Sequence, residues 1–555
     1  MVTYKDLADY IFSDVVDTIE DLEKKYPPRN LMQNAEVTRF APSPTGFLHL
    51  GSLFMSLIAK KMAFDTNGVF YIRLEDTDTK REIEGSGKQL IDQLDHFGII
   101  PDEGYLGDKE KGDYGPYQQS NRAYIYRVCI KHLMEIGRAY PCFCSHEQIE
   151  EIRQVQMAMK VVPGYYGEYA MCRNIEPEEA LRRIKAGEKY VIRFRSLGNH
   201  NNKVTFHDEI RGDISIAEND LDVVILKGDG LPTYHFAHAV DDHFMHTTTV
   251  LRGEEWIASA PIHLELFNAL GFALPKYAHA PVIMKLDNGN RRKLSKRKDP
   301  EASVAHFIEQ GFPKEALKCY LMSIANSNFE EWTEVNHCFD IDKFKFSLSK
   351  MSLDGVLFDQ DKLNYFSKEI IASFTASELY HRLVAWSKEY DEVLYNHIAN
   401  KEEFTTAILN IERGGEKARK DYVAYSDVYP IIGFFFRDRY DEITKDGYPF
   451  NPAIDKEIIK AVLSDFKTTN DYSLPNDLWF QNVKSLGVKH NFAESNKIYK
   501  QNKDAYHGHV GDVAEIIRIS LVGAKNSPNL YNILQILGKD EVNSRIDKVI
   551  DYLSK

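Results

Sequence analysis

Two short segments of the chain carry side chains that could act on a phosphate group. The first is a loop at residues 39–52, which two prolines stiffen and which ends in His49-Leu50-Gly51-Ser52. An imidazole at a helix start can donate a hydrogen bond to a phosphate, and the exposed backbone N–H groups there favour anions. The glycine lets a backbone approach a nucleotide closely. Taken alone, so short a motif favours a proline-rich turn with a capping histidine.

The second segment is a cluster of positive charge at residues 291–298, where six of eight side chains are lysine or arginine. A charge run of this kind is usually a solvated loop. Its position favours another interpretation, because it follows the last predicted strand of the α/β region, as the first loop follows the first strand. Loops at the carboxyl ends of parallel strands open on one edge of a sheet. Lys293 and Lys296 could there neutralise a pyrophosphate leaving group.

The elements that must position these loops alternate between strand and helix. We predict a first block of strand 37–41, a helix from residue 50, strand 68–74 and helix 86–97, and a second block of strands 223–226 and 247–251, helix 257–270 and strand 277–283. Such alternation is typical of βαβ units and predicts a parallel sheet. The residues between the two blocks lack it, and we interpret them as an insertion that ends near Asp220.

The two ends of the chain have helical patterns. Residues 1–30 carry apolar side chains at helical spacing up to Pro27-Pro28, which predicts one amphipathic helix packed on the body of the protein. After about residue 300 the helical periodicity continues to the end, and residues 526–528 predict a turn between two helices.

Composition excludes several classes of protein. Apolar residues make up 43% of the 555 residues and charged residues 27%, as in a folded globular protein. The net charge of −14 argues against a non-specific nucleic-acid binder but allows local basic patches. No run approaches the ~20 apolar residues of a membrane helix. The first 30 residues contain seven acidic and four basic side chains and resemble neither a secretory signal nor a transit peptide. Six cysteines are too few for a disulfide scaffold. We therefore expect a cytoplasmic protein that has no membrane partner.

Several further motifs, in order along the chain, resemble those of class I aminoacyl-tRNA synthetases, in particular the bacterial type of glutamyl-tRNA synthetase. The matching segments are residues 39–46, 49–52, 73–78, 117–122, 232–234, 241–243, 251–255 and 293–297. The resemblance continues at residues 357–364 and near the end at residues 518–523 and 530–538. One such motif would be weak evidence, whereas the ordered set is highly specific.

The resemblance implies an α/β Rossmann-type catalytic domain with an α+β insertion, followed by an all-α anticodon-binding region. We assign residues 1–35 to an N-terminal helical extension, 36–300 to the catalytic domain with an acceptor-binding insertion at about 120–220, 301–370 to a stem-contact region and 371–555 to the helical anticodon-binding region. The implied activity is ATP-dependent attachment of glutamate to tRNA(Glu) through glutamyl-adenylate, with Mg²⁺ bound to ATP. Relatives also imply activation only in the presence of tRNA, and a monomer.

The resemblance also implies roles for particular residues. The expected catalytic residues, which contact the phosphates, are His49, Lys293 and Lys296. The expected ATP-binding residues are Pro42, Ser43, Pro44, Thr45, Gly46, His49, Gly51, Ser52, Lys293, Leu294, Ser295, Lys296 and Arg297. The expected glutamate-binding residues are Arg39, Ala41, Ser43, Glu75, Tyr234 and Arg252. Among them, Glu75 suits the substrate ammonium, and the guanidinium fork of Arg252 suits its side-chain carboxylate.

The predicted insertion contains cysteines at the spacing of a metal site. Some relatives bind structural zinc there through Cys-x-Cys and Cys-x-His, which correspond to Cys142, Cys144 and Cys172, but Asn174 stands where the histidine would be. Tyr169 could complete an unusual tetrahedral site. Three buried free cysteines explain the same residues, so both interpretations stay open.

The sequence also departs from relatives near the expected active site. His238 takes a position where many relatives have other residues, and the residues after the basic motif are Asp299-Pro300 in place of the common Asp-Gly. The role of His238 is therefore open, and the second change can alter closure of the basic loop.

Four other functions compete with a glutamate-specific enzyme. A glutaminyl-tRNA synthetase typically has Glu at the position of Ser43 and lacks Arg252, so both residues favour glutamate. A truncated tRNA-modification enzyme would lack the long helical region after residue 300, and a non-catalytic adaptor would be expected to lose His49 or a signature lysine. A non-discriminating glutamyl-tRNA synthetase, which also charges glutamine tRNA, stays open.

Overall fold

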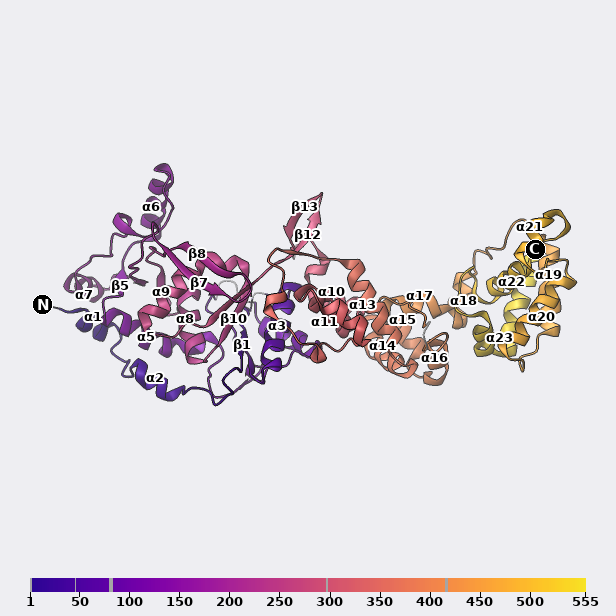
Figure 1. The fold of residues 1–555 in the computed structure, drawn as a ribbon, viewed down its shortest axis with the longest axis horizontal. Helices are drawn as coiled ribbons and strands as arrows, with labels where there is room; N and C mark the ends of the chain where they lie inside the picture. Colours follow the sequence, from indigo (N-terminus) through magenta and orange to yellow (C-terminus); the bar gives the residue numbers. More distant parts are fainter. Residues whose placement is uncertain (1, 45, 79–82, 296–297, 415–417) are drawn as a thin grey trace. The chain divides into compact units, whose positions relative to one another are not determined.

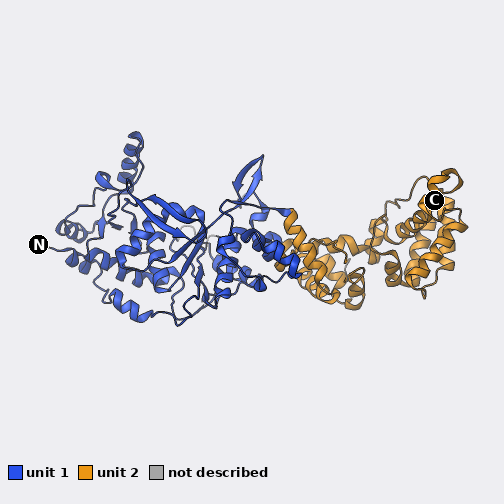
Figure 2. Ribbon diagram, in the orientation of Figure 1, with its two compact units in different colours: residues 1–307, 318–360 blue, residues 308–317, 361–555 orange. Residues whose placement is uncertain are grey.

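The computed structural model describes residues 2–44, 46–78, 83–295, 298–414 and 418–555. The chain forms two compact units, one of residues 1–307 and 318–360 and the other of residues 308–317 and 361–555 (Figure 2). None of the helices in these described ranges is both long and apolar enough to cross a membrane.

The first unit contains two neighbouring sheets of four strands each (Figure 1). Their parallel strands alternate with helices and are together called the parallel sheet. Its first block consists of β1 (Val37–Phe40), α3 (Leu50–Asp65), β2 (Val69–Ile72), α4 (Ser86–His96) and β3 (Glu103–Tyr105). These three strands are parallel, and the short β4 (Glu110–Lys111) pairs antiparallel with β3. The predicted alternation of strand and helix over residues 37–97 is confirmed.

The second block adds β10 (Thr249–Gly253), α9 (Ala260–Leu270) and β11 (Lys276–Ala280), with the two strands parallel. β10 begins beside β1, where the Thr248 N–H donates to the Val37 carbonyl at 3.0 Å. Both blocks therefore present their carboxyl-terminal loops on one edge. The helix predicted at 257–270 begins only at Ala260, because residues 257–259 belong to a 3-10 helix, Glu254–Ser259.

The strand predicted at residues 223–226 exists as β9 (Val224–Leu226), but its predicted place in the parallel sheet is wrong. It pairs antiparallel with β6 (Val191–Phe194), which pairs antiparallel with β5 (Ala139–Cys142). This small sheet belongs to the predicted insertion and continues past residue 220. A short apolar run indicates a buried strand but not which sheet it joins.

A long hairpin, β7 (Lys203–Asp208) and β8 (Gly212–Ala217), links this region to the parallel sheet. Asp208 bridges to Tyr277 of β11, and the Glu209 N–H donates to the Tyr277 carbonyl at 2.8 Å. The hairpin thereby brings Asp208, from the end of β7, beside the edge of the sheet.

The remaining elements of the first unit surround these sheets. Its helices include α5 (Ala123–Glu135), α6 (His146–Ala158), α7 (Pro177–Lys185), α8 (Tyr234–Phe244) and α12 (Phe329–Asn336), and its other strands are β12 (Ile283–Asp287), β13 (Asn290–Lys293) and β14 (Val356–Leu357). β12 and β13 form a hairpin that projects from the body of the unit (Figure 1). The basic segment therefore begins within the hairpin strand β13 and continues after it, and does not directly follow the last parallel strand as predicted.

The N-terminal residues form two helices, so the prediction of one helix is wrong. α1 (Tyr4–Ile11) and α2 (Ile19–Lys25) each begin with a capping box, at Thr3 with Asp6 and at Thr18 with Asp21. The capping box at Thr18 provides hydrogen-bond partners for the unpaired N–H groups at the start of α2, so a new helix begins there. Apolar side chains of both helices are buried against α5 and its neighbours, as the amphipathic pattern predicts.

The second unit contains only helices among its described regular elements. They include α14 (Ala376–Tyr390), α15 (Glu392–Ile398), α16 (Glu402–Leu409), α17 (Val428–Ile432), α18 (Arg437–Ile443), α19 (Lys456–Thr469), α20 (Asn476–Lys489), α21 (Asn496–Gln501), α22 (Val510–Val522) and α23 (Leu530–Leu553). The helices α10 (Val304–Gln310), α11 (Lys314–Ala325) and α13 (Gln360–Ser373) lie where the chain passes between the units. The last element bends at Gly538, where φ is 73° and ψ is 167°. The helical prediction for the end of the chain is confirmed.

Candidate active site

One cavity of about 720 Å³ opens at the carboxyl-terminal edge of the parallel sheet. All six residues predicted to bind glutamate line it: Arg39, Ala41, Ser43, Glu75, Tyr234 and Arg252. They come from the ends of β1, β2 and β10 and from the first residue of α8. The Glu75 N–H donates to the Pro42 carbonyl at 2.9 Å, which ties the loops after β1 and β2 together. The structure thus brings the predicted residues together, while their role in binding stays a prediction.

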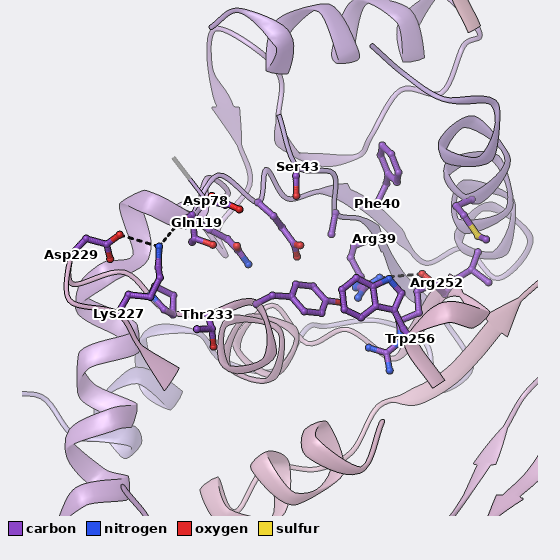
Figure 3. A pocket seen from close by; sticks show the side chains of 17 residues that line it. Arg39, Phe40, Ser43, Asp78, Gln119, Lys227, Asp229, Thr233, Arg252 and Trp256 are labelled. Atoms are coloured by element: carbon purple, nitrogen blue, oxygen red, sulfur yellow. Dashed lines mark hydrogen bonds and ion pairs between the residues drawn. The ribbon is translucent and has the colours of Figure 1, made fainter. Parts of the chain in front are cut away.

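The cavity has differently charged ends. Figure 3 shows Arg39, Arg252 and Trp256 at one end and Lys227 with Asp229 at the other. The Lys227 ammonium lies 3.0 Å from Asp229 and 2.6 Å from the Thr77 carbonyl. Lys227, Asp229 and Trp256 also line the cavity and were not predicted from the sequence. A signal existed for all three, because they adjoin the recognised motifs at 232–234 and 251–255.

A smaller cavity of about 240 Å³ adjoins the first and shares Phe40 and Met55 with it. Its walls include several of the residues predicted to bind ATP, namely His49, Gly51, Ser52, Lys293 and Leu294. The two segments singled out in the sequence therefore meet at one cavity. Three of the predicted ATP-site residues, Thr45, Lys296 and Arg297, lie outside the described residues.

His49 is the N-cap residue of α3, and its backbone is extended there. Its side chain makes no capping hydrogen bond to the described first turn, so the simple interpretation of a capping histidine does not hold. The Lys293 ammonium lies 2.9 Å from the Glu255 carboxylate, and both side chains are about half exposed. Such a surface pair is weak, so the lysine can exchange this partner for a phosphate.

Asp299, which precedes the departure at Pro300, holds the base of the basic loop. Its carboxylate accepts the Ser295 N–H at 2.9 Å and pairs with Arg292 at 2.5 Å. Ser295 immediately precedes the undescribed Lys296. The departure therefore leaves the carboxylate in place, and it anchors the loop through backbone and ion-pair contacts.

A buried network of charges lies under the first cavity. The Asp242 carboxylate contacts Arg39 Nε at 3.1 Å and Arg73 Nη1 at 2.6 Å, and all three side chains are nearly inaccessible to solvent. Arg73 also contacts Glu75 at 3.0 Å. Burial by itself would raise the pKa of Asp242, but Arg39 and Arg73 outweigh it and hold this pKa well below its usual value. Burial raises the pKa of Glu75, and Arg73 opposes that rise.

His238, whose role was open, belongs to this network and not to the wall of the cavity. It is fully buried, with Nδ1 at 2.6 Å from Asp242 and Nε2 at 3.2 Å from the Tyr277 hydroxyl. Burial lowers the pKa of His238 to about 3, despite the carboxylate beside it. The imidazole is therefore neutral at physiological pH.

The three predicted metal ligands also converge. The sulfur atoms of Cys142, Cys144 and Cys172 all lie within 4.8 Å of one another. The neighbouring hydroxyl belongs to Tyr165, at 3.2 Å from the Cys144 sulfur and 3.4 Å from the Cys142 sulfur. Tyr169, suggested from the sequence, points its hydroxyl instead to the sulfur of Met159 at 3.6 Å.

The thiols of this cluster share hydrogen bonds. Hydrogen bonds with Cys172 and Tyr165 lower the pKa of Cys142 to about 4, although burial opposes the shift. The same contact with Cys142 and burial raise the pKa of Cys172. One thiolate is therefore stabilised among neutral donors, and a thiolate is the form of cysteine that binds a metal ion.

The chain is similar to known proteins over nearly its whole length. Residues 36–365 match the family of tRNA synthetases class I (E and Q), catalytic domain, and residues 417–550 match an anticodon binding domain. The chain is 45% identical to a glutamate–tRNA ligase of Clostridium perfringens strain SM101 and 46% identical to one of Acetivibrio thermocellus, over 99% of this chain and 100% of each relative. The crystal structure of a glutamate tRNA ligase from Elizabethkingia meningosepticum in complex with its amino acid is similar, with a TM-score of 0.75 and 27% identity over 94% of this chain and 100% of that one.

The buried network predicts a pH-dependent loss of stability in Asp242→Asn. The amide would leave Arg39 and Arg73 without their shared charge, which costs about 3–5 kcal/mol of unfolding free energy at neutral pH. Because the folded pKa of Asp242 is depressed, its carboxylate stabilises the protein above the unfolded pKa of about 4, and this contribution is lost as the pH falls through the folded pKa. Denaturant unfolding should therefore show that Asp242→Asn has a lower free energy of unfolding than the unmodified protein at pH 7. The difference between the two proteins should be smaller at pH 3.

Asp213→Asn is a matched control, because Asp213 is 75% exposed on β8. Equal stability of Asp242→Asn and this control at pH 7 would contradict the importance of the buried pairs.

Proposed function

This chain belongs to the class I tRNA synthetases of the glutamate and glutamine type, and we propose that it works as a glutamate–tRNA ligase. In the first step the substrate α-carboxylate attacks the α-phosphorus of ATP, the bond to the bridging oxygen breaks, and pyrophosphate leaves. In the second step a ribose hydroxyl of the terminal tRNA nucleotide attacks the acyl carbon, loses its proton, and releases AMP.

The observation that carries glutamate as the substrate is Arg252, a 94% buried guanidinium in the wall of the larger cavity. Within the described chain its hydrogen bonds go to imidazoles and its guanidinium lies 4.8 Å from the centre of the Tyr277 ring, with no carboxylate paired to it. A buried cation that the protein does not neutralise favours an anionic ligand. Glutamate differs from glutamine by that one charge.

The adjoining cavities suggest how the two substrates meet. We assign the amino acid to the larger cavity and the ATP phosphates to the smaller one, which His49 and Lys293 line. Because the reaction requires little covalent chemistry from the protein, positioning and charge stabilisation dominate. Mg²⁺ on ATP would neutralise phosphate charge, and Lys296 is proposed to contact the leaving pyrophosphate.

The helical region is proposed to contact tRNA. Residues 301–370 are assigned to the stem and residues 371–555 to the anticodon, and the match of residues 417–550 to an anticodon binding domain supports the second assignment. Activity on tRNA(Gln) in addition to tRNA(Glu) stays an alternative, because anticodon contacts decide it. A monomer in the cytoplasm stays part of the proposal.

A zinc ion is proposed at Cys142, Cys144 and Cys172, with the Tyr165 hydroxyl as the fourth ligand. The convergence of three sulfur atoms and one hydroxyl supports the proposal, since structural zinc takes four ligands and prefers thiolates. Bound zinc would fix the insertion by crosslinking β5 to the segment before α7. Packing of three free thiols is the competing explanation.

Pyrophosphate exchange and tRNA charging test the function. We expect ATP–pyrophosphate exchange with glutamate when tRNA(Glu) is present, and little exchange with glutamine or without tRNA. Charging of purified tRNA(Glu) and tRNA(Gln) separates a specific enzyme from a non-discriminating one. Exchange that depends on glutamine and ignores glutamate would refute the proposal.

Arg252→Ala is expected to raise the KM for glutamate steeply and to narrow the ratio of glutamate to glutamine activity. A buried charge that faces the amide of glutamine is poorly paired, at a cost of about 3–5 kcal/mol, and the alanine variant removes that penalty. Arg252→Lys should rescue glutamate only partly, because an ammonium cannot reproduce a bidentate fork.

Arg153→Ala, at an exposed position of α6, is the control for this series. If Arg252→Ala keeps the unmodified discrimination, the carboxylate is recognised elsewhere, and Arg39 is the next residue to test.

The zinc proposal predicts about one zinc ion per purified chain by elemental analysis. Cys142→Ser should lose the metal and lower the thermal unfolding midpoint, whereas Cys129→Ser, a buried cysteine of α5 outside the cluster, should keep the metal. A zinc content under about a tenth of an ion per chain in the unmodified protein would leave the cysteines as packing residues.

A further inference from the structure

The guanidinium of Arg252 has an unusual set of partners. Its Nε donates to Nε2 of His279 at 2.9 Å, and its Nη1 lies 3.1 Å from Nδ1 of His263. Its Nη2 is buried and has no hydrogen-bond partner in the described part of the chain. Two nitrogens are therefore held by the protein and the third is unpaired, in a residue that lines the larger cavity.

The other arginines of the site are bound differently. Arg39 and Arg73 both contact the carboxylate of Asp242, and Arg73 contacts Glu75 as well. Their charge is balanced inside the protein. Arg252 is oriented by imidazole nitrogens, which accept hydrogen bonds without cancelling the positive charge. A carboxylate in either histidine position would orient the arginine equally well but would compete with an anionic substrate.

The histidine at position 279 is itself held in the tautomer that this contact requires. Its Nδ1 lies 2.6 Å from the Asp208 carboxylate, which also accepts the His279 backbone N–H at 3.0 Å. An ionised carboxylate only accepts, so the ring proton is on Nδ1 and the lone pair on Nε2 faces Arg252. Asp208 reaches this place because the β7–β8 hairpin pairs with the edge of the sheet.

The second histidine, His263, also presents an accepting ring nitrogen to Arg252. His263, on α9, presents Nδ1 to Arg252 and has Nε2 at 3.0 Å from Nδ1 of His235. With the lone pair of Nδ1 directed at an obligate donor, the proton of His263 is on Nε2 and is donated to His235. Asp208 therefore selects the tautomer of His279, whereas Arg252 itself selects that of His263.

We propose that His279 and His263 are positioning residues, which hold the charged Arg252 guanidinium in the wall of the cavity where the side-chain carboxylate of the substrate is recognised. The proposal rests on the function given above and assigns specificity to residues behind the arginine as well as to the arginine.

The electrostatic surroundings keep both rings neutral. Burial lowers the pKa of His279, an effect that Asp208 opposes and Arg252 reinforces. Burial also lowers the pKa of His263 well below its usual value, with further contributions from His238 and Arg252. Neutral rings are required, because an imidazolium has no lone pair for an arginine.

Acceptor-retaining variants separate positioning from simple packing. In His279→Gln the side-chain oxygen can take the place of Nε2, and in His263→Asn the oxygen can take the place of Nδ1. His279→Leu and His263→Leu fill similar space but accept no hydrogen bond. The two pairs of variants therefore differ chiefly in the acceptor offered to Arg252.

The expected result is a rise of about 10- to 100-fold in the KM for glutamate in each leucine variant, because a hydrogen bond to a charged group is lost. The kcat and the KM for ATP should change by less than about threefold, and the glutamine and asparagine variants should recover most of the loss. His207→Leu is the control, since this histidine is 63% exposed on β7, next to Asp208.

All variants are assayed by tRNA-dependent pyrophosphate exchange beside the unmodified protein. Absence of glutamate-dependent exchange in the unmodified protein would refute the proposed function itself. With an active unmodified protein, leucine variants that keep its KM, or acceptor-retaining variants that lose as much as the leucine variants, would overturn the positioning role. If one leucine variant does not fold, the pair at the other histidine gives the same comparison.

Discussion

Two adjacent buried carboxylates, Asp241 and Asp242 near the end of α8, are the constraint on which the catalytic unit depends. Asp242 holds Arg39 and Arg73, and Asp241 holds Arg122 at 2.6 Å. These arginines come from β1, from the loop after β2 and from the 3-10 helix before α5. Charges taken out of water require close partners, so removing either carboxylate deprives its arginines of a buried ion-pair partner. The network therefore fixes three separate segments around one helix and sets the shape of the cavity above it.

The N-terminal extension supports the same C-terminal end of α8. Glu23 contacts His243 at 2.6 Å, the Tyr26 carbonyl lies 2.8 Å from His246, and Arg29 donates to the Met245 carbonyl at 3.0 Å. These contacts lie directly after the two buried carboxylates in the chain. The extension thus has a structural reason to be part of the catalytic unit, because it limits the movement of the residues that hold the charge network.

The arginines around the cavity differ in whether a carboxylate balances their charge. Arg39 and Arg73 are neutralised by carboxylates and serve to join strands, whereas Arg252 is oriented by neutral groups and keeps its charge. The low polarity of a buried site strengthens such an unbalanced charge, and it makes a matched anion far more favourable than a neutral amide. Architecture and recognition are therefore carried by the same residue type with different partners.

The sequence by itself determined most helices and strands and the types of residue at the candidate site. The tertiary structure decided which strands pair and which side chains contact one another. Strand–helix alternation, the loops at His49 and Lys293 and the terminal helices were readable because periodicity and turn residues report local burial. Periodicity does not report pairing, so β9 was placed in the wrong sheet and the break before Thr18 was missed. Tyr165, and not Tyr169, reaches the cysteines, and His279 and His263 reach Arg252 from 27 and 11 residues away. Such contacts depend on how distant segments pack, which no local pattern encodes.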